Sequence, residues 1–169
     1  PLSHHSDVLV RLNDVAPCYE GRMVCAPLSA KIRQGERVCL SGRNGCGKSS
    51  LLKVIMGEQI AHTGTVELAS GLVISCVPQD ASFLCGLPGA YAKQLGIDES
   101  LFKALLRKMG FARADFEQEM SGYSDGQKKK VLIAGSLCQQ AHLYIWDEPL
   151  NFIDVFSRMQ IEDLLLKYR

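Results

Sequence analysis

A glycine-rich loop at residues 42–49 carries the residue types that bind phosphate. It reads Gly-Arg-Asn-Gly-Cys-Gly-Lys-Ser, which fits the spacing G-x-x-x-x-G-K-S. Glycines let the backbone curl so that successive N–H groups point at anionic oxygens, and a following helix adds roughly half a positive charge at its N-terminus. We expect Lys48 to reach the β- and γ-phosphates of a nucleoside triphosphate and the Ser49 hydroxyl to ligate Mg²⁺.

The segments on either side of this loop suit a phosphate site. Residues 36–41 (Glu-Arg-Val-Cys-Leu-Ser) are typical of a short buried strand, and residues 49–56 of a helix that ends before Gly57. A glycine-rich turn that matched the spacing by chance would not need a strand before it and a helix after it. The sequence therefore predicts binding of a nucleoside triphosphate.

A second group of chemically active residues follows an apolar run near the C-terminus. Residues 142–149 read His-Leu-Tyr-Ile-Trp-Asp-Glu-Pro, which is the pattern of a buried parallel strand that ends at a site. An unpaired carboxylate costs several kcal/mol to desolvate, so two of them at the end of a buried strand indicate a function. We expect Asp147 to hold Mg²⁺ and Glu148 to act as the general base. The alternative is a strand end capped by exposed acids.

The remaining pattern supplies the elements that position these groups. We predict strands at 9–15, 23–25, 66–68 and 72–77, with a hairpin joining the last two, and helices at 98–109, 127–137 and 155–169. The last helix is expected to present Ile161, Leu164, Leu165 and Tyr168 on one face. Gln79 follows a predicted strand, where it is either a polar terminus or a contact to a metal or its water. The lysines at 128–130 are interpreted as a solvated helix face, and the alternative is that an anion such as a partner's nucleotide lies near them.

Bulk properties exclude several classes of protein. With 169 residues, 47% apolar content and a formal charge of +1, the chain suits one globular domain and shows no electrostatic preference for nucleic acid. No apolar run approaches the ~20 residues that cross a bilayer. Seven cysteines without a C-x-x-C pair are typical of reduced thiols in the cytosol.

Taken in order, these motifs and two further ones resemble an ATP-binding cassette (ABC) ATPase domain. The match extends from about Val8 through the loop, Gln79, the segment 124–127 (Ser-Asp-Gly-Gln), the Asp-Glu pair and the segment 151–154 (Asn-Phe-Ile-Asp). The resemblance implies an α/β fold: a P-loop NTPase (RecA-like) core with a mostly parallel sheet, an N-terminal antiparallel β subdomain and a small helical subdomain. It also implies that residues 1–169 form a single ABC ATPase domain that uses ATP and Mg²⁺.

The resemblance assigns a role to each candidate residue. Lys48 and Glu148 are expected to be catalytic, and Ser49, Gln79 and Asp147 to hold the metal. The residues expected to bind nucleotide are Tyr19, whose ring would stack on adenine, and Gly42, Arg43, Asn44, Gly45, Cys46, Gly47, Lys48, Ser49 and Ser50. The signature loop, which contacts the ATP of the opposite domain, corresponds to Ser124, Asp125, Gly126 and Gln127. Asn151 and Asp154 would belong to the loop that crosses the dimer interface. Without the resemblance, Tyr19 is either a partly exposed turn residue or a platform for a base.

The motif Asp-Glu-Pro-Leu-Asn-Phe-Ile-Asp resembles that of soluble ABC-F translation factors. The segments Gly-Gln-Lys-Lys-Lys and Ser-Leu-Cys are similar to the second ATPase domain of ABC-F ribosome-protection proteins, which confer antibiotic resistance. That likeness implies a second ABC ATPase domain and the ribosome as partners and a cytoplasmic location. Two alternatives stay open: the ATPase subunit of an ABC membrane transporter, and a nucleotide-gated interaction module with little turnover.

The sequence departs from the family pattern at two places. The signature reads Tyr-Ser-Asp-Gly-Gln instead of Leu-Ser-Gly-Gly-Gln, and Asp125 places a carboxylate near a γ-phosphate site. No histidine follows Glu148, although the family has a switch histidine beyond the last helix. We therefore expect the domain to be incomplete at its C-terminus.

Overall fold

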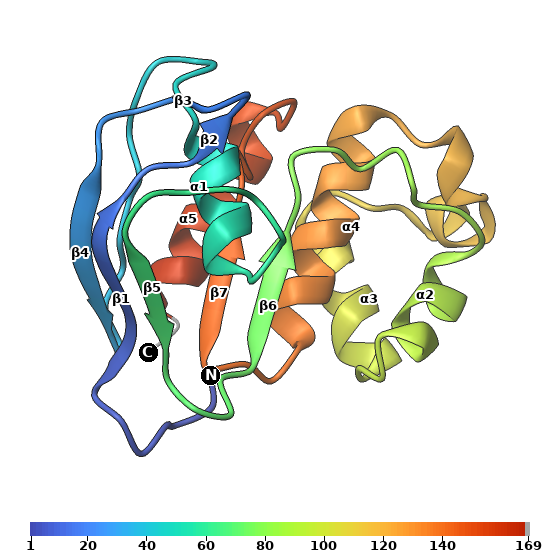
Figure 1. Ribbon diagram of the computed structural model, residues 1–169. Coiled ribbons are helices and arrows are strands. Elements are labelled where there is room, and N and C mark those ends of the chain that lie inside the picture. The colour runs from blue at the N-terminus through green and yellow to red at the C-terminus, as the bar shows by residue number, and fades with distance from the viewer. Residues whose placement is uncertain (168–169) are drawn as a thin grey trace. The chain divides into compact units, whose positions relative to one another are not determined.

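The computed structural model describes residues 1–167 of the chain. The described chain divides into two compact units, one made of Pro1–Ile74 with Ala141–Ile145 and the other of Ser75–Gln140 with Trp146–Arg169. Figure 1 labels the helices and strands of both. Whether residues 1–169 act as a single domain stays a prediction.

The first unit contains a three-stranded antiparallel sheet in the order β4-β1-β5 (Figure 1). The central strand β1 (Val8–Val15) pairs with β4 (Leu28–Arg33) on one side and with β5 (Thr65–Leu68) on the other. Two shorter strands, β2 (Cys18–Tyr19) and β3 (Arg22–Met23), form a separate hairpin. These sheets confirm the expected antiparallel β region near the N-terminus.

Helix α1 (Lys48–Ile55) supplies the apolar face that packs in the first unit. Its buried residues are Leu51, Val54 and Ile55, which share one core with the buried side chains of β1. The helix ends where Gly57 adopts a φ of 86°, a conformation that other residues adopt only with strain. Packing of α1 therefore fixes the position of the loop that precedes it.

Strands β6 (Ile74–Val77) and β7 (Leu143–Trp146) form a two-stranded sheet. The His142 N–H donates to the Val73 carbonyl, and the Asp147 N–H donates to the Val77 carbonyl, both at 2.9 Å. Because residue numbers rise together along both strands, the pairing is parallel, as the arrows in Figure 1 also show. The α/β class is confirmed, and β6 with β7 makes up the parallel part within the described residues.

The second unit is mainly helical. It holds α2 (Pro88–Gln94), α3 (Glu99–Lys108), α4 (Asp125–Cys138) and α5 (Val155–Lys167), with short 3-10 helices at Arg113–Glu117 and Met120–Gly122. The side chains of Phe102, Leu106, Met109, Ile133 and Ile161 are fully buried in one core. Asp98 caps α3 by accepting from the Leu101 N–H at 2.6 Å, as its position before the helix predicts.

Two of the predicted β features are wrong. Residues 36–41 form no strand, and their side chains are exposed, with 63% of Val38 open to solvent. A strand needs a paired neighbour, and a short apolar run does not provide one. The predicted hairpin of 66–68 with 72–77 is also absent within residues 1–167, because β5 pairs with β1 instead. The expected position of Tyr168 on the last helix lies outside the described residues.

Two findings bear on classes of protein considered above. No helix within residues 1–167 is long and apolar enough to cross a membrane. All seven cysteines are free thiols, and Cys39, in the segment 36–41 predicted as a buried strand, is exposed.

Candidate functional site

The loop at 42–49 closes around the ammonium group of Lys48. Lys48 Nζ donates to the carbonyl oxygens of Gly42 at 2.8 Å and Arg43 at 2.9 Å. The Cys46 N–H donates to the Arg43 carbonyl at 3.2 Å and completes a turn within the loop. The sequence predicts a cation at this loop, and in the structure the Lys48 ammonium group is hydrogen-bonded to the backbone of the loop.

Glycine is favoured at two points of this loop. Gly47 precedes α1 with a φ of 89°, and a Cβ there would lie 2.8 Å from Val24 Cγ2. A Cβ on Gly42 would lie 2.6 Å from Cys46 Sγ. The positive φ of Gly47 favours glycine at that position, and a Cβ on Gly42 would force the Cys46 side chain to move. The backbone curl that a phosphate cradle needs is therefore present.

The side chain of Tyr19, in strand β2, lies beside the first turn of helix α1. Its hydroxyl is 3.0 Å from Ser50 Oγ, and 49% of the residue is exposed. An exposed ring beside a candidate phosphate loop can stack on a planar base. The structure thus places the Tyr19 hydroxyl beside Ser50, two residues after Lys48, and the role of these residues in nucleotide binding stays a prediction.

In the second unit, the carboxylate of Glu148 accepts hydrogen bonds from the side-chain amides of two other candidate site residues. Gln79 Nε2 donates to Glu148 Oε2 at 3.1 Å, and Asn151 Nδ2 donates to the same oxygen. Glu148 adopts a φ of 46°, and its carbonyl accepts from the Asn151 N–H at 3.2 Å, so the chain turns directly after the acidic pair. This turn is the reason that a residue three positions later reaches the carboxylate.

The candidate metal residues carry the atoms that Mg²⁺ prefers. Ser49 offers a hydroxyl, Gln79 an amide oxygen and Asp147 a carboxylate, all hard oxygen donors. Mg²⁺ keeps several waters and uses few protein ligands, so each of these donors suits it. Ser49 belongs to the first unit, and Gln79 and Asp147 belong to the second. The described residues contain no group of three or more His, Cys, Asp or Glu suited to a metal.

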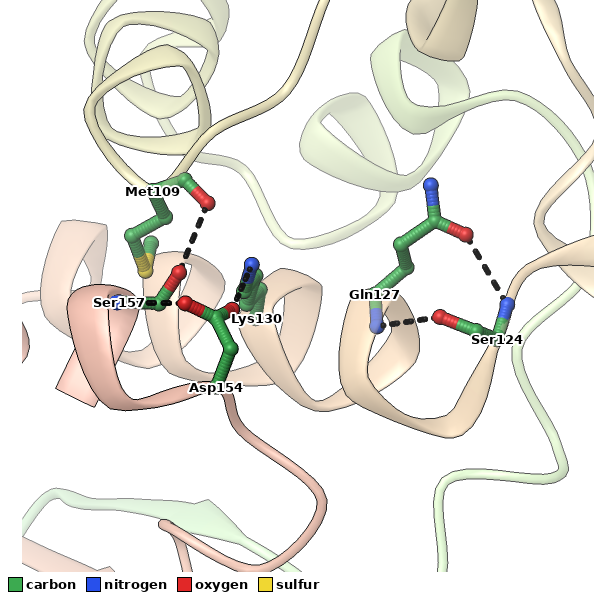
Figure 2. A network of polar contacts seen from close by, with 6 residues as sticks. All are labelled: Met109, Ser124, Gln127, Lys130, Asp154 and Ser157. Carbon is green, nitrogen blue, oxygen red and sulfur yellow. Dashed lines mark hydrogen bonds and ion pairs between the residues drawn. The ribbon is translucent and has the colours of Figure 1, made fainter.

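The segment 124–127 begins helix α4 with a capping box (Figure 2). Ser124 Oγ accepts from the Gln127 N–H at 3.2 Å, and Gln127 Oε1 accepts from the Ser124 N–H at 3.0 Å. Asp125 is in the first helical turn, where the helix dipole favours a carboxylate. The backbone that follows is therefore fixed, and its first N–H groups face out of the helix end.

Gly126 allows the interface-loop candidate to approach this helix end. A Cβ on Gly126 would lie 2.6 Å from the carbonyl oxygen of Phe152. Phe152 itself has a φ of 64° and is 73% exposed. The loop at 151–154 thus passes directly against the signature-loop candidate, and both belong to the second unit.

Lys130 and Asp154 tie the two loops together. Figure 2 shows the Asp154 carboxylate between Lys130 Nζ, at 2.9 Å, and the Ser157 N–H, at 2.8 Å. Ser157 Oγ donates in turn to the Met109 carbonyl at 3.3 Å. The N–H of Ser157 and the charge of Lys130 hold the pKa of Asp154 well below its usual range. Asp154 therefore caps α5 as an ionised group.

The interpretation of residues 128–130 as a solvated face is wrong for Lys129. This side chain is 2% exposed, and its Nζ donates to the carbonyls of Pro78 at 3.1 Å and Gln79 at 2.9 Å. The helical spacing contains the missed signal, because Lys129 stands three and four residues before the buried Leu132 and Ile133. A lysine on the apolar face of a helix needs internal acceptors.

Comparison with known proteins places these motifs in one family. A family model described as ABC transporter matches residues 25–151, which include the glycine-rich loop, Gln79, the signature-loop candidate and the acidic pair. Two curated relatives are zinc import ATP-binding proteins named ZnuC. The one from Marinobacter nauticus is 29% identical over 97% of this chain and 65% of its own length. The one from Pseudomonas aeruginosa is 30% identical over 96% of this chain and 62% of its own.

Solved structures share the fold. An ATP-binding protein of an ABC transporter from Pyrococcus furiosus superposes with a TM-score of 0.77 at 22% identity, over 93% of this chain and 84% of that one. A cobalt transport ATP-binding protein gives a TM-score of 0.72 at 22% identity, over 93% and 66%. This chain spans less than two thirds of the length of the two zinc import relatives.

Proposed function

We propose that this chain is the ATP-hydrolysing part of a transporter. The chain belongs to the ABC transporter family, whose ATPase domains bind ATP with Mg²⁺ and hydrolyse it. The observation that carries the proposal is the loop at 42–49, whose backbone curls around the Lys48 ammonium. A triphosphate would take over the interactions that the Gly42 and Arg43 carbonyls now make with Lys48. The N–H groups at the start of α1 would face the same anion.

The remaining candidates have roles in this proposal that follow from their chemistry. Ser49, Gln79 and Asp147 would hold Mg²⁺, which when bound neutralises charge on the phosphate oxygens. Glu148 would accept a proton from the attacking water, oriented by the amides of Gln79 and Asn151 that hold its carboxylate. Tyr19 would stack on the base.

A second ATPase domain is the partner that the proposal requires. The start of α4 and the loop at 151–154 lie against each other, and both would face the nucleotide of the opposite domain. Asp125 brings a negative charge to that surface, so we expect weaker closure than a glycine at this position would give, because the carboxylate repels the phosphates. Since ATP and Mg²⁺ are the ligands, we place the domain in the cytoplasm.

The transporter assignment is supported by relatives whose names describe zinc import, and they do not support the ABC-F assignment. One observation favours a second candidate, an ABC-F translation factor that protects ribosomes from antibiotics. Asn151, the residue at which the sequence resembles ABC-F proteins, donates its side-chain amide to Glu148. That contact gives Asn151 a defined place beside the candidate general base.

The experiment that separates the two uses the natural gene product with Glu148→Gln. This change removes the base but keeps the shape, so the ATP-bound form should accumulate. Cells are fractionated with ATP into membranes and ribosomes. We expect the trapped protein with the membrane fraction, together with a permease. ATP-dependent sedimentation with ribosomes instead would contradict the transporter proposal and support the translation factor.

A further inference from the structure

Lys129 is a fully buried charge with a specific pair of acceptors. It is 2% exposed, and its side chain is among the largest that are fully buried. Its Nζ donates to two consecutive carbonyl oxygens, those of Pro78 at 3.1 Å and Gln79 at 2.9 Å. Burying an ammonium group carries a large desolvation penalty, so a lysine at this position needs internal acceptors such as these two carbonyls.

The two carbonyls belong to the segment that carries Gln79. This segment leaves β6 at Val77, whose own carbonyl accepts from the Asp147 N–H at 2.9 Å. The Gln79 side chain then reaches Glu148 Oε2 at 3.1 Å. A continuous set of contacts therefore runs from Lys129 on α4, through the Gln79 backbone, to the carboxylate of Glu148.

The charged groups near Lys129 partly compensate its burial. Burial lowers the pKa of Lys129 from its ordinary value, and the carboxylates of Asp147, Glu148 and Asp80 oppose this shift. The neighbouring lysines are placed differently. Lys128 is only partly buried, and Lys130 pairs with Asp154 at 2.9 Å.

We infer that Lys129 is a positioning residue, which fixes the Gln79 backbone so that the Gln79 side chain is aimed at Glu148 and at the metal site. The inference rests on the proposed function, because it assigns Gln79 to Mg²⁺. Through Lys129, a movement of α4 becomes a movement of Gln79. The start of the same helix is the signature-loop candidate, so closure on a second domain would be transmitted to the metal site by this side chain.

The test compares four variants of the full chain. Lys129→Met keeps the side-chain length but removes the donor, and Lys128→Met is the matched control. The other two are Gln79→Ala and the double variant that combines Lys129→Met with Gln79→Ala. Hydrogen–deuterium exchange of residues 79–82 is measured without nucleotide. Binding of a slowly hydrolysed ATP analogue is then titrated with Mg²⁺. We expect Lys129→Met to raise exchange in this segment and to require about tenfold more Mg²⁺, as loss of an outer-shell partner does elsewhere. Lys128→Met should match the wild type in both.

The double variant distinguishes positioning from a general effect on the fold. If Lys129 acts through Gln79, then Lys129→Met adds nothing to the Mg²⁺ requirement once Gln79 is Ala. Additive effects, or wild-type exchange in Lys129→Met, would overturn the inference. If Lys129→Met does not fold, Lys129→Leu, which also lacks a donor, replaces it, and a wild-type Mg²⁺ requirement in that variant would also overturn the inference. A wild-type chain that ignores Mg²⁺ would refute the proposed function, and the exchange comparison would still decide the role of Lys129.

Discussion

The side-chain amide of Gln79 donates a hydrogen bond to Glu148 Oε2 at 3.1 Å, although the two residues are 69 positions apart. The strand β6 ends before Gln79, and the strand β7 ends before the acidic pair. Parallel strands bring their carboxyl ends to the same edge of a sheet, and the Asp147 N–H bond to the Val77 carbonyl shows this directly. The candidate general base and a candidate metal residue are therefore neighbours because of the topology.

The first prediction concerns the general base. Glu148→Gln should reduce ATP hydrolysis by about 10²–10⁴-fold, the usual contribution of a positioned base, and leave ATP affinity unchanged. Glu162→Gln, on the exposed face of α5, is the matched control and should behave as wild type. Phosphate release and nucleotide binding are measured on the same preparations. Wild-type turnover in Glu148→Gln would remove Glu148 from the mechanism.

The second prediction concerns the partner domain. If the start of α4 acts on a nucleotide held by another domain, the isolated chain should turn over slowly and its rate per molecule should rise with protein concentration. In other enzymes, removing one hydrogen-bond donor that stabilises the charge of the transition state lowers the rate by about 10²–10³-fold. The measurement is a dilution series of steady-state hydrolysis. A turnover near the ~10 s⁻¹ typical of enzymes, independent of concentration, would show that one chain is sufficient.

The third prediction uses the close approach at Gly126. A methyl group there would lie 2.6 Å from the Phe152 carbonyl, so Gly126→Ala must displace the loop at 151–154. Overpacking of this kind costs about 1–3 kcal/mol. Gly122→Ala is the control, because its Cβ would lie 3.4 Å from Gln118 Nε2, an ordinary contact. The free energy of unfolding of Gly126→Ala should be lower than that of Gly122→Ala by this amount, which thermal unfolding measures as a lower melting temperature. Equal melting temperatures would contradict the placement of Phe152.

The fourth prediction is a pH dependence at Asp154. Its pKa is below the ordinary value because the Ser157 N–H and the Lys130 ammonium favour the carboxylate. The folded form therefore binds its proton at lower pH than the unfolded form, and the stabilisation is complete above about pH 4 and lost as the pH falls further. Asp154→Asn keeps a capping side chain and loses the charge.

We expect Asp154→Asn to be less stable than wild type at pH 7 by no more than about 1 kcal/mol, since the carboxylate is 56% exposed in this pair. The difference should shrink as the pH falls below about 4. Unfolding in denaturant at a series of pH values measures it. A difference that is constant down to pH 2 would mean that the ion pair does not contribute.

Local sequence patterns predicted the helices and strands that are specified by residues within a single short segment of the chain. The alternation at 9–15, the glycine stop at Gly57 and the cap at Asp98 each act within a few residues, and β1, α1 and α3 follow them. Strand β4 was missed although its residues alternate between partly buried and exposed. Helix α2 was missed because its seven residues, beginning Pro-Gly, are too few to show a helical period.

Pairing between distant segments could not be predicted in the same way. The sequence at 66–77 suited a hairpin, but β5 found its partner in β1, more than 50 residues earlier in the chain. Segment 36–41 had a strand pattern and no strand formed. In the candidate site, the resemblance to a family named the residues, and the contacts of Lys129, Lys130 and Asn151 required the fold.

The central claim is that the loop at 42–49 binds Mg-ATP, and calorimetry on Lys48→Ala tests it most directly. Removing the ammonium group deletes a charge-assisted contact to phosphate worth about 1.5–3 kcal/mol, which corresponds to a loss of affinity of roughly tenfold or more. Lys53→Ala, on the exposed side of the same helix α1, is the matched control. The account predicts Mg-ATP binding by wild type and Lys53→Ala and a weakened Lys48→Ala. Equal affinity of all three proteins would contradict it.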